Sequence, residues 1–179
     1  MREKILFSLF GLVLLAGPAL AEAQSDSGAP QLSAGYSALH ESLDGEGFWD
    51  NGFTGDAVFV FGGRNSARLG AVAQFTTHRN SDFDDTLVAG LGGLRIAFGT
   101  GRLEPFAQLL LGAEHCCDPG QYGFAIQPGF GLTGWFSSVI GARATVDFRT
   151  SRYTDPDFDT SKWYSEPIIG ASIVVRLGY

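Results

Sequence analysis

The stretch EPIIGASIVVRLGY, residues 166–179, decides the fold that the sequence predicts. Every second residue in it is apolar up to an aromatic last residue, and this period of two is typical of a β-strand rather than a helix. The other face is small or medium-sized and carries a charge near each end, Glu166 and Arg176. One face therefore suits lipid and the other a crowded polar interior. The apolar face consists of Pro167, Ile169, Ala171, Ile173, Val175, Leu177 and Tyr179.

Seven earlier segments repeat this alternation, so the sequence predicts eight strands. Long connections follow the first, third, fifth and seventh segments, the longest being residues 150–163, whereas short turns follow the others. An even strand count brings both chain ends to the rim with the short turns, as in membrane barrels. The predicted fold class is all-β: an eight-stranded antiparallel up-and-down transmembrane β-barrel, closed by pairing its first and last strands. The segments are Leu32–Glu41, Phe53–Phe61, Ala67–His78, Thr86–Phe98, Arg102–Glu114, Tyr122–Thr133 and Val139–Arg149.

The N-terminus has the pattern of a secretory signal peptide. Two cations precede an apolar run at residues 5–15, and small residues with cleavage sites after Ala21 or Ala23 follow it. The alternative is an uncleaved anchor helix, for which the apolar run is short. We therefore expect a signal peptide at residues 1–23, a flexible periplasmic leader at 24–31 and the barrel at 32–179.

Composition supports this assignment. The chain has 25 glycines and only 17% charged residues, and Lys162 is the one lysine after the signal, which fits β structure better than a helical globule. No apolar run after the signal approaches the roughly 18 residues of a membrane helix. The net charge of −7 disfavours nucleic acid as a partner.

These features resemble the small outer-membrane β-barrel proteins of Gram-negative bacteria, in particular the OmpA/OmpX-like eight-stranded family. The resemblance rests on the signal peptide, the eight alternating strands, the segment FAIQPGFGLTGWFSSVIGARATVDFR and the end VVRLGY. It implies a monomer in the cell outer membrane that contacts membrane lipids and lipopolysaccharide, without a cofactor and with an unidentified surface partner. It also implies a terminal signal read by the barrel-assembly machinery, although Val174 stands where the family usually has Gly. The matching signal residues are Ala171, Ile173, Val175, Leu177 and Tyr179.

The inward residues predict a polar network. An eight-stranded barrel is just wide enough to be filled by its own side chains. Because isolated charges there are costly, those of opposite sign are expected to pair and to plug the interior. The alternative is a small pore gated by those pairs. The set is Asp56, Arg68, Arg95, Glu104, Glu114, Arg143, Asp147, Arg149, Glu166 and Arg176.

No catalytic residue is predicted. His40, His78 and His115 are expected to be exposed at the outer rim. His40-Glu41-Ser42 contains the residue types found in lipid A-modifying barrels, but consecutive strand residues point to opposite faces. A structural or surface-interaction role is therefore expected. The alternatives are an outer-membrane lipid-modifying enzyme on the same scaffold and a soluble periplasmic barrel that binds a lipophilic ligand.

The outer loops are acidic. The expected loops hold ten acidic residues, Asp44, Glu46 and Asp50 among them, against three basic residues, Arg79, Arg152 and Lys162. Asp155, Asp157 and Asp159 have the spacing of a calcium loop, but Thr160 stands where the turn requires Gly, so a solvated loop with weak collective affinity for divalent cations is expected. The adjacent Cys116 and Cys117 could form a vicinal disulfide, intermolecular bridges or free thiols.

Overall fold

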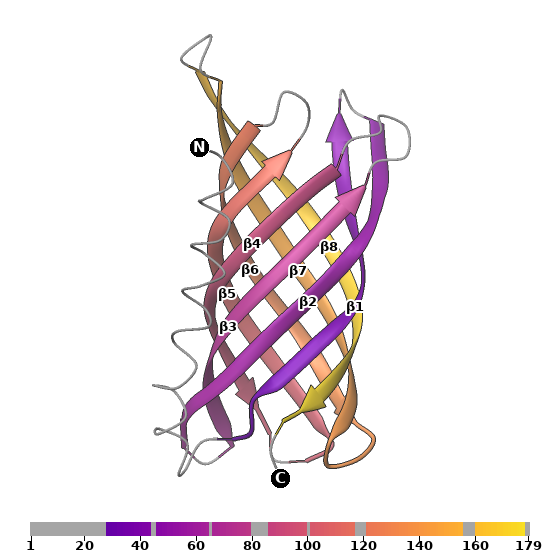
Figure 1. Ribbon diagram of the computed structural model, residues 1–179, viewed down its shortest axis with the longest axis vertical. Coiled ribbons are helices and arrows are strands. Elements are labelled where there is room, and N and C mark those ends of the chain that lie inside the picture. Colours follow the sequence, from indigo (N-terminus) through magenta and orange to yellow (C-terminus); the bar gives the residue numbers. More distant parts are fainter. Residues whose placement is uncertain are drawn as a thin grey trace.

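The chain forms a closed barrel of eight antiparallel strands in sequence order (Figure 1). The structure, a computed structural model, describes residues 28–43, 46–64, 66–79, 86–99, 101–116, 121–155 and 160–177. No helix in these ranges is long and apolar enough to cross a membrane. The predicted fold class is confirmed. The strands are β1 (Gln31–Leu43), β2 (Glu46–Arg64), β3 (Ala67–Arg79), β4 (Thr86–Phe98), β5 (Leu103–Cys116), β6 (Gln121–Trp135), β7 (Ile140–Asp155) and β8 (Thr160–Arg176).

The first and last strands close the barrel. Their pairing runs from Gln31 opposite Arg176 to Leu39 opposite Ile168. β1 therefore begins and β8 ends at the same rim, where the turns after β2, β4 and β6 also lie (Figure 1). We call this the turn rim and the opposite end the outer rim. Beyond Leu39 and Ile168, the described residues of the β1–β2 and β7–β8 hairpins continue without pairing to each other.

Alternation of side chains produces an apolar outer surface. In β5, residues such as Leu109 and Leu111 are exposed, whereas Gln108 and Leu110 between them are buried. All eight strands carry large exposed apolar residues on the outward face. We call this surface the apolar band. It spans 32–36 in β1, 53–61 in β2, 69–75 in β3, 88–98 in β4, 103–113 in β5, 122–132 in β6, 140–148 in β7 and 167–177 along and just after β8.

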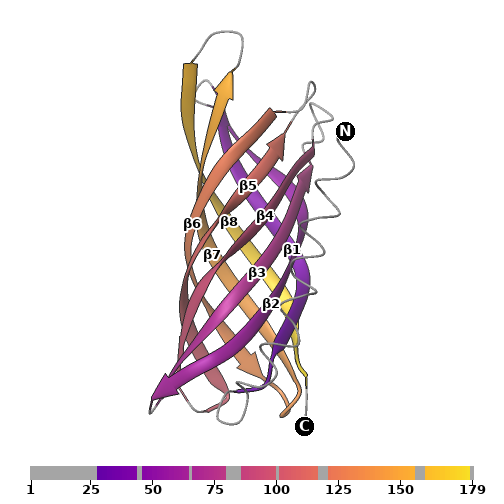
Figure 2. The ribbon, with the colours of Figure 1, turned by 60° about the vertical axis from the view of Figure 1, so that its left-hand side comes forward.

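Several strands are longer than predicted. Residues 150–163 were expected to form a loop, but β7 continues to Asp155 and β8 begins at Thr160, so this hairpin rises above the others (Figure 2). Likewise, β2 begins at Glu46 rather than at Phe53. The outer segments lack the apolar alternation that marks a lipid-facing strand, so periodicity did not reveal them, although their Thr, Tyr and Trp residues favour strands.

Two position-specific predictions are also corrected. Gln31 is the first residue of β1 and not part of a leader. Asp50 was expected in an outer loop, but it lies in β2 with a buried side chain. The predicted signal peptide lies outside the described residues.

Candidate functional site

Asp56 on β2 is the centre of an ion-pair cluster inside the barrel. Arg143 on β7 donates from Nη1 to both carboxylate oxygens of Asp56, at 2.7 and 2.8 Å. Arg95 on β4 donates from Nη2 to Oδ2 of Asp56 at 3.2 Å. The guanidinium carbons of Arg95 and Arg143 lie 4.2 and 5.3 Å from the ring centroid of Phe106. All three charged residues, which we call the Asp56 cluster, are buried, and the single carboxylate takes the place of water as a partner of both guanidinium groups.

A second acidic centre, Glu104 on β5, lies nearer the turn rim. Its Oε1 accepts from Arg176 Nη2 at 2.6 Å and forms an ion pair with Arg68 Nη2 at 2.7 Å. The guanidinium carbon of Arg176 lies 3.6 Å from the ring centroid of Trp135. The Arg68 and Arg176 side chains are partly exposed, while Glu104 is buried. This pair of arginines therefore connects the interior to solvent at the turn rim.

Gln108 links the Asp56 cluster to Asp147. Its Oε1 accepts from Arg95 Nη2 at 2.6 Å, and its Nε2 donates to Asp147 Oδ1 at 2.9 Å. Asp147 is buried on β7, between Arg143 and Arg149 along the inward face. An amide, which both donates and accepts, thus joins a cation to an anion across the interior.

Arg149 on β7 organises the interior nearer the outer rim. It is fully buried and uses three nitrogens: Nη1 donates to Glu114 Oε2 at 2.9 Å, Nη2 to Thr76 Oγ1 at 2.7 Å and Nε to Gln127 Oε1 at 2.9 Å. The Tyr153 hydroxyl donates to the other Glu114 oxygen. We call these residues the Arg149 cluster. It ties β7 to β3, β5 and β6 across the interior.

Glu166 faces the Arg149 cluster, but no ion pair joins it to Arg149 in the described structure. It is the register partner of Arg149, yet the Arg149 donors go to other groups. Burial, followed by the charges of Glu114, Glu41 and Asp50, raises the pKa of Glu166 to about 8. Glu166 lies just above the apolar band, and at neutral pH its carboxyl is predominantly protonated.

His78 is buried, which corrects the prediction of an exposed rim histidine. Its Nε2 lies 2.9 Å from the Ser37 hydroxyl. Burial, followed by the charge of Arg149, lowers the pKa of His78 to about 3, so its ring is neutral. Its Nδ1 has no hydrogen-bond partner in the described part of the chain. A nucleophilic triad needs a carboxylate at that nitrogen and an accessible serine, whereas Ser37 is also buried.

Sequence reasoning missed the uncharged members of the interior network. Gln31, Gln74, Thr76, Gln108 and Gln127 all make side-chain hydrogen bonds to other inward residues. Each occupies an inward position in the alternation, so register combined with hydrogen-bonding capacity could have identified them. The prediction considered charge alone.

Apolar side chains also pack inside the barrel. Leu91 on β4 and Leu110 on β5 are buried and belong to one packed group with Val72 on β3. Along β5, Leu110 lies between Gln108, which contacts the Asp56 cluster, and Glu114 of the Arg149 cluster. The interior therefore holds apolar side chains packed beside polar groups, which continue from Gln108 and Asp147 to Gln127 and Arg149.

The remaining predicted site residues are less completely described. Cys116 is disulfide-bonded, and Cys117 lies outside the described residues, as do Asp157, Asp159 and Tyr179. Asp155 ends β7 opposite Thr160. The predicted signal residues Ala171, Ile173, Val175 and Leu177 lie on the outward face. Within the described ranges, no group of three His, Cys, Asp or Glu residues could hold a metal ion.

Comparison with known proteins supports the fold. No protein-family model matches the chain, and no curated protein matches it. The crystal structure of Neisserial surface protein A is similar at 13% identity and a TM-score of 0.66, over 86% of this chain and 100% of that one. The structure of Ail, the attachment invasion locus protein of Yersinia pestis, in complex with the heparin analogue sucrose octasulfate, is similar at 17% identity and a TM-score of 0.50, over 82% of this chain and 98% of that one. This chain therefore has the fold of the small eight-stranded outer-membrane β-barrels, as its sequence resemblance implied.

Proposed function

We propose that the protein is an integral outer-membrane β-barrel with a structural or surface-interaction role, a filled interior and no open pore. The apolar band carries this proposal. Phe53 and Tyr122 are 69% and 72% exposed, and similar side chains surround the barrel on every strand. A continuous apolar surface of this extent is unfavourable in water and marks contact with lipid or another apolar phase.

The dimensions of the apolar band fit a bilayer. It extends from Val88 to Phe98 in β4 and from Leu103 to Ala113 in β5, which agrees with the roughly 9–11 residues of a tilted transmembrane strand. Aromatic residues such as Tyr36, Phe53 and Phe75 lie at its outer edge. Polar residues follow directly along the strands, including Thr86, His115 and Thr150.

The filled interior supports a barrel without an open pore. Arg143 joins β7 to Asp56 on β2, and Arg149 joins β7 to Glu114 on β5, so side chains cross the interior at two levels. An eight-stranded barrel leaves little more room than its inward side chains occupy. In planar bilayers we expect no open-channel steps from the native chain, and regular conductance steps would contradict the closed interior.

The projecting hairpins support a surface-interaction role. Trp49 on β2, with Trp163 and Tyr164 on β8, is exposed beyond the apolar band, and the guanidinium carbon of Arg152 lies 5.8 Å from the ring centroid of Trp163. Exposed aromatic and arginine side chains are enriched at protein interfaces. The partner stays unidentified. The proposal includes export through a cleaved signal peptide, assembly by the barrel-assembly machinery and contact with lipopolysaccharide.

Fractionation tests the membrane assignment. The chain should leave outer membranes only with detergent, and its folded and heated forms should migrate differently on a denaturing gel. Release by buffer alone would support the soluble-barrel alternative, which the exposed apolar band disfavours.

The enzyme alternative has a separate test. The Ser37–His78 pair is the arrangement that most resembles a catalytic site, but both side chains are buried and His78 lacks an orienting carboxylate at Nδ1 in the described structure. Mass spectrometry should give the same lipid A from cells carrying the native chain and the Ser37→Ala variant. A lipid A modification that the variant abolishes would establish an enzymatic function.

A further inference from the structure

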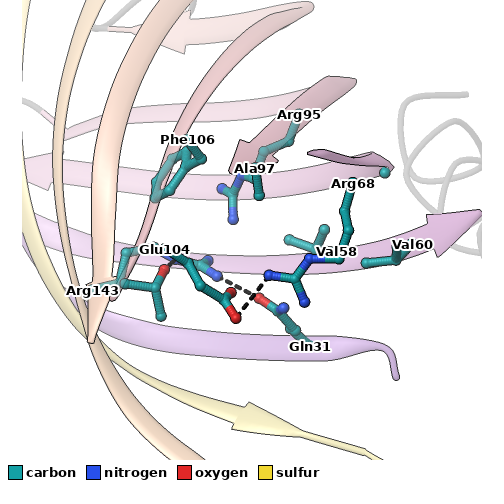
Figure 3. A pocket seen from close by; sticks show the side chains of 11 residues that line it. Gln31, Val58, Val60, Arg68, Arg95, Ala97, Glu104, Phe106 and Arg143 are labelled. Atoms are coloured by element: carbon teal, nitrogen blue, oxygen red, sulfur yellow. Dashed lines mark hydrogen bonds and ion pairs between the residues drawn. The ribbon is translucent and has the colours of Figure 1, made fainter. Parts of the chain in front are cut away.

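The interior contains a small cavity lined by Arg95 and Arg143 of the Asp56 cluster and by Glu104 (Figure 3). Its volume is about 20 Å³, and its lining includes Arg68, Arg95 and Arg143. A cavity of roughly 10–15 Å³ on the same measure holds one water-sized particle. The guanidinium groups of the three arginines extend from different strands toward this space (Figure 3). The cavity therefore has room for one small species.

The charges around the cavity do not cancel. Arg68, Arg95 and Arg143 line the cavity and supply three positive charges, while Glu104 in the lining and Asp56, which pairs with Arg95 and Arg143, supply two negative ones. Outside the lining, Arg176 adds one positive charge and Asp147 one negative charge. Four cations and three anions leave a net charge of +1. Compensation of an uncancelled interior charge is strongly favourable because the surroundings screen it poorly.

The buried side-chain atoms of the cavity lining that lack a hydrogen-bond partner in the described structure are all arginine nitrogens, which are donors. Arg95 Nη1 has no partner in the described structure, although the Arg95 side chain is only 4% exposed. Arg68 Nε also lacks a partner there. The contact of Arg68 Nη2 with Glu104 is an ion pair without hydrogen-bond geometry. Several oxygens nearby already accept from arginines: Asp56 from two of them, Glu104 Oε1 from Arg176, and Gln31 Oε1 from Arg143 Nη2 at 2.8 Å. A species held by such groups must accept hydrogen bonds and carry negative charge.

We propose that this cavity binds one small monovalent anion of chloride size. Its charge would balance the net +1 of the surrounding residues, and its coordination would use Arg95 Nη1 and Arg68 Nε. The Arg68 side chain is 27% exposed, so exchange with solvent takes place from the turn rim. The site is a structural one that stabilises the folded barrel, and it is independent of any surface partner.

Anomalous diffraction identifies the occupant. Crystals of the detergent-solubilised full chain grown in sodium bromide should give an anomalous peak beside Arg95 and Arg68. Crystals of the Arg95→Met variant should lack it, because Arg143 remains to pair with Asp56 while the unused donor is removed. Density without an anomalous signal would indicate water and would overturn the proposal.

Unfolding in solution gives an independent readout. At constant ionic strength, chloride should stabilise the barrel more than the bulky gluconate ion, and the effect should saturate. At ten times the dissociation constant, the folding equilibrium constant should increase about elevenfold. Arg95→Met should abolish this chloride effect, with Arg68→Gln as a second variant if the first does not fold. The exposed Arg102, which does not line this cavity, supplies the control Arg102→Gln, which should retain the effect. Identical native unfolding curves in both salts would overturn the proposal.

Discussion

Replacing Arg149 by methionine removes the cation of the Arg149 cluster while retaining much of its volume. The guanidinium satisfies Glu114, Thr76 and Gln127 at once, and Arg149 is fully buried. Its loss leaves the Glu114 carboxylate buried and without a cation. Removing one partner of a buried ion pair typically costs about 3–5 kcal/mol. We expect the free energy of unfolding of Arg149→Met to fall by that amount.

The measurement is urea-induced unfolding of barrels folded in lipid vesicles. The fluorescence of the three tryptophans reports the transition. Arg152→Met is the matched control, because Arg152 is exposed on the same strand and stacks near Trp163; its cost should be below about 1 kcal/mol. Adding Glu114→Gln to Arg149→Met should recover about 1–3 kcal/mol, since the uncompensated charge is then gone. A cost below about 1 kcal/mol for Arg149→Met, or no recovery in the double variant, would refute the ion-pair reasoning.

Two further changes test other parts of the molecule. The pKa of Glu166 is raised from 4.5 in the unfolded chain to about 8, so the folded state binds an extra proton and the free energy of unfolding should fall as the pH rises through this range. Glu166→Gln should flatten that part of the stability profile, and an unchanged slope would exclude this carboxyl group as its cause. Tyr179→Ala should lower the amount of heat-modifiable barrel in cells, because Tyr179 ends the predicted assembly signal; normal accumulation would show that the terminal aromatic is dispensable.

The lipid-facing half of the fold could be predicted because one physical constraint acts along whole strands. A strand between lipid and a polar interior must alternate, and β4 was predicted with the bounds that the structure has, Thr86–Phe98. Above the membrane that constraint disappears. The outer parts of β2, β7 and β8 were therefore assigned to loops, and Asp50 was placed at the surface although it is buried.

The interior shows a similar division. Alternation identified which charged residues face inward, such as Asp56 and Arg143, because successive residues of a strand point to opposite faces. Alternation does not specify which inward residues pair with each other. Arg149 forms an ion pair with Glu114 on β5 and not with its register partner Glu166. This choice depends on how far the side chains reach across the barrel. The burial of His78 follows from the same alternation, because His78 shares the inward face of β3 with Gln74 and Thr76; the prediction of an exposed histidine considered only its place near the outer rim.

The membrane assignment is tested most directly by nitroxide labels on two outward residues of β5. Leu109 lies within the apolar band, whereas His115 lies beyond it toward the outer rim. With the barrel in lipid vesicles, a label at position 109 should collide with oxygen, which concentrates in lipid, and be shielded from a water-soluble nickel complex. A label at position 115 should show the reverse. Equal access of the nickel complex to both positions would contradict a lipid-facing band and with it the proposed outer-membrane barrel.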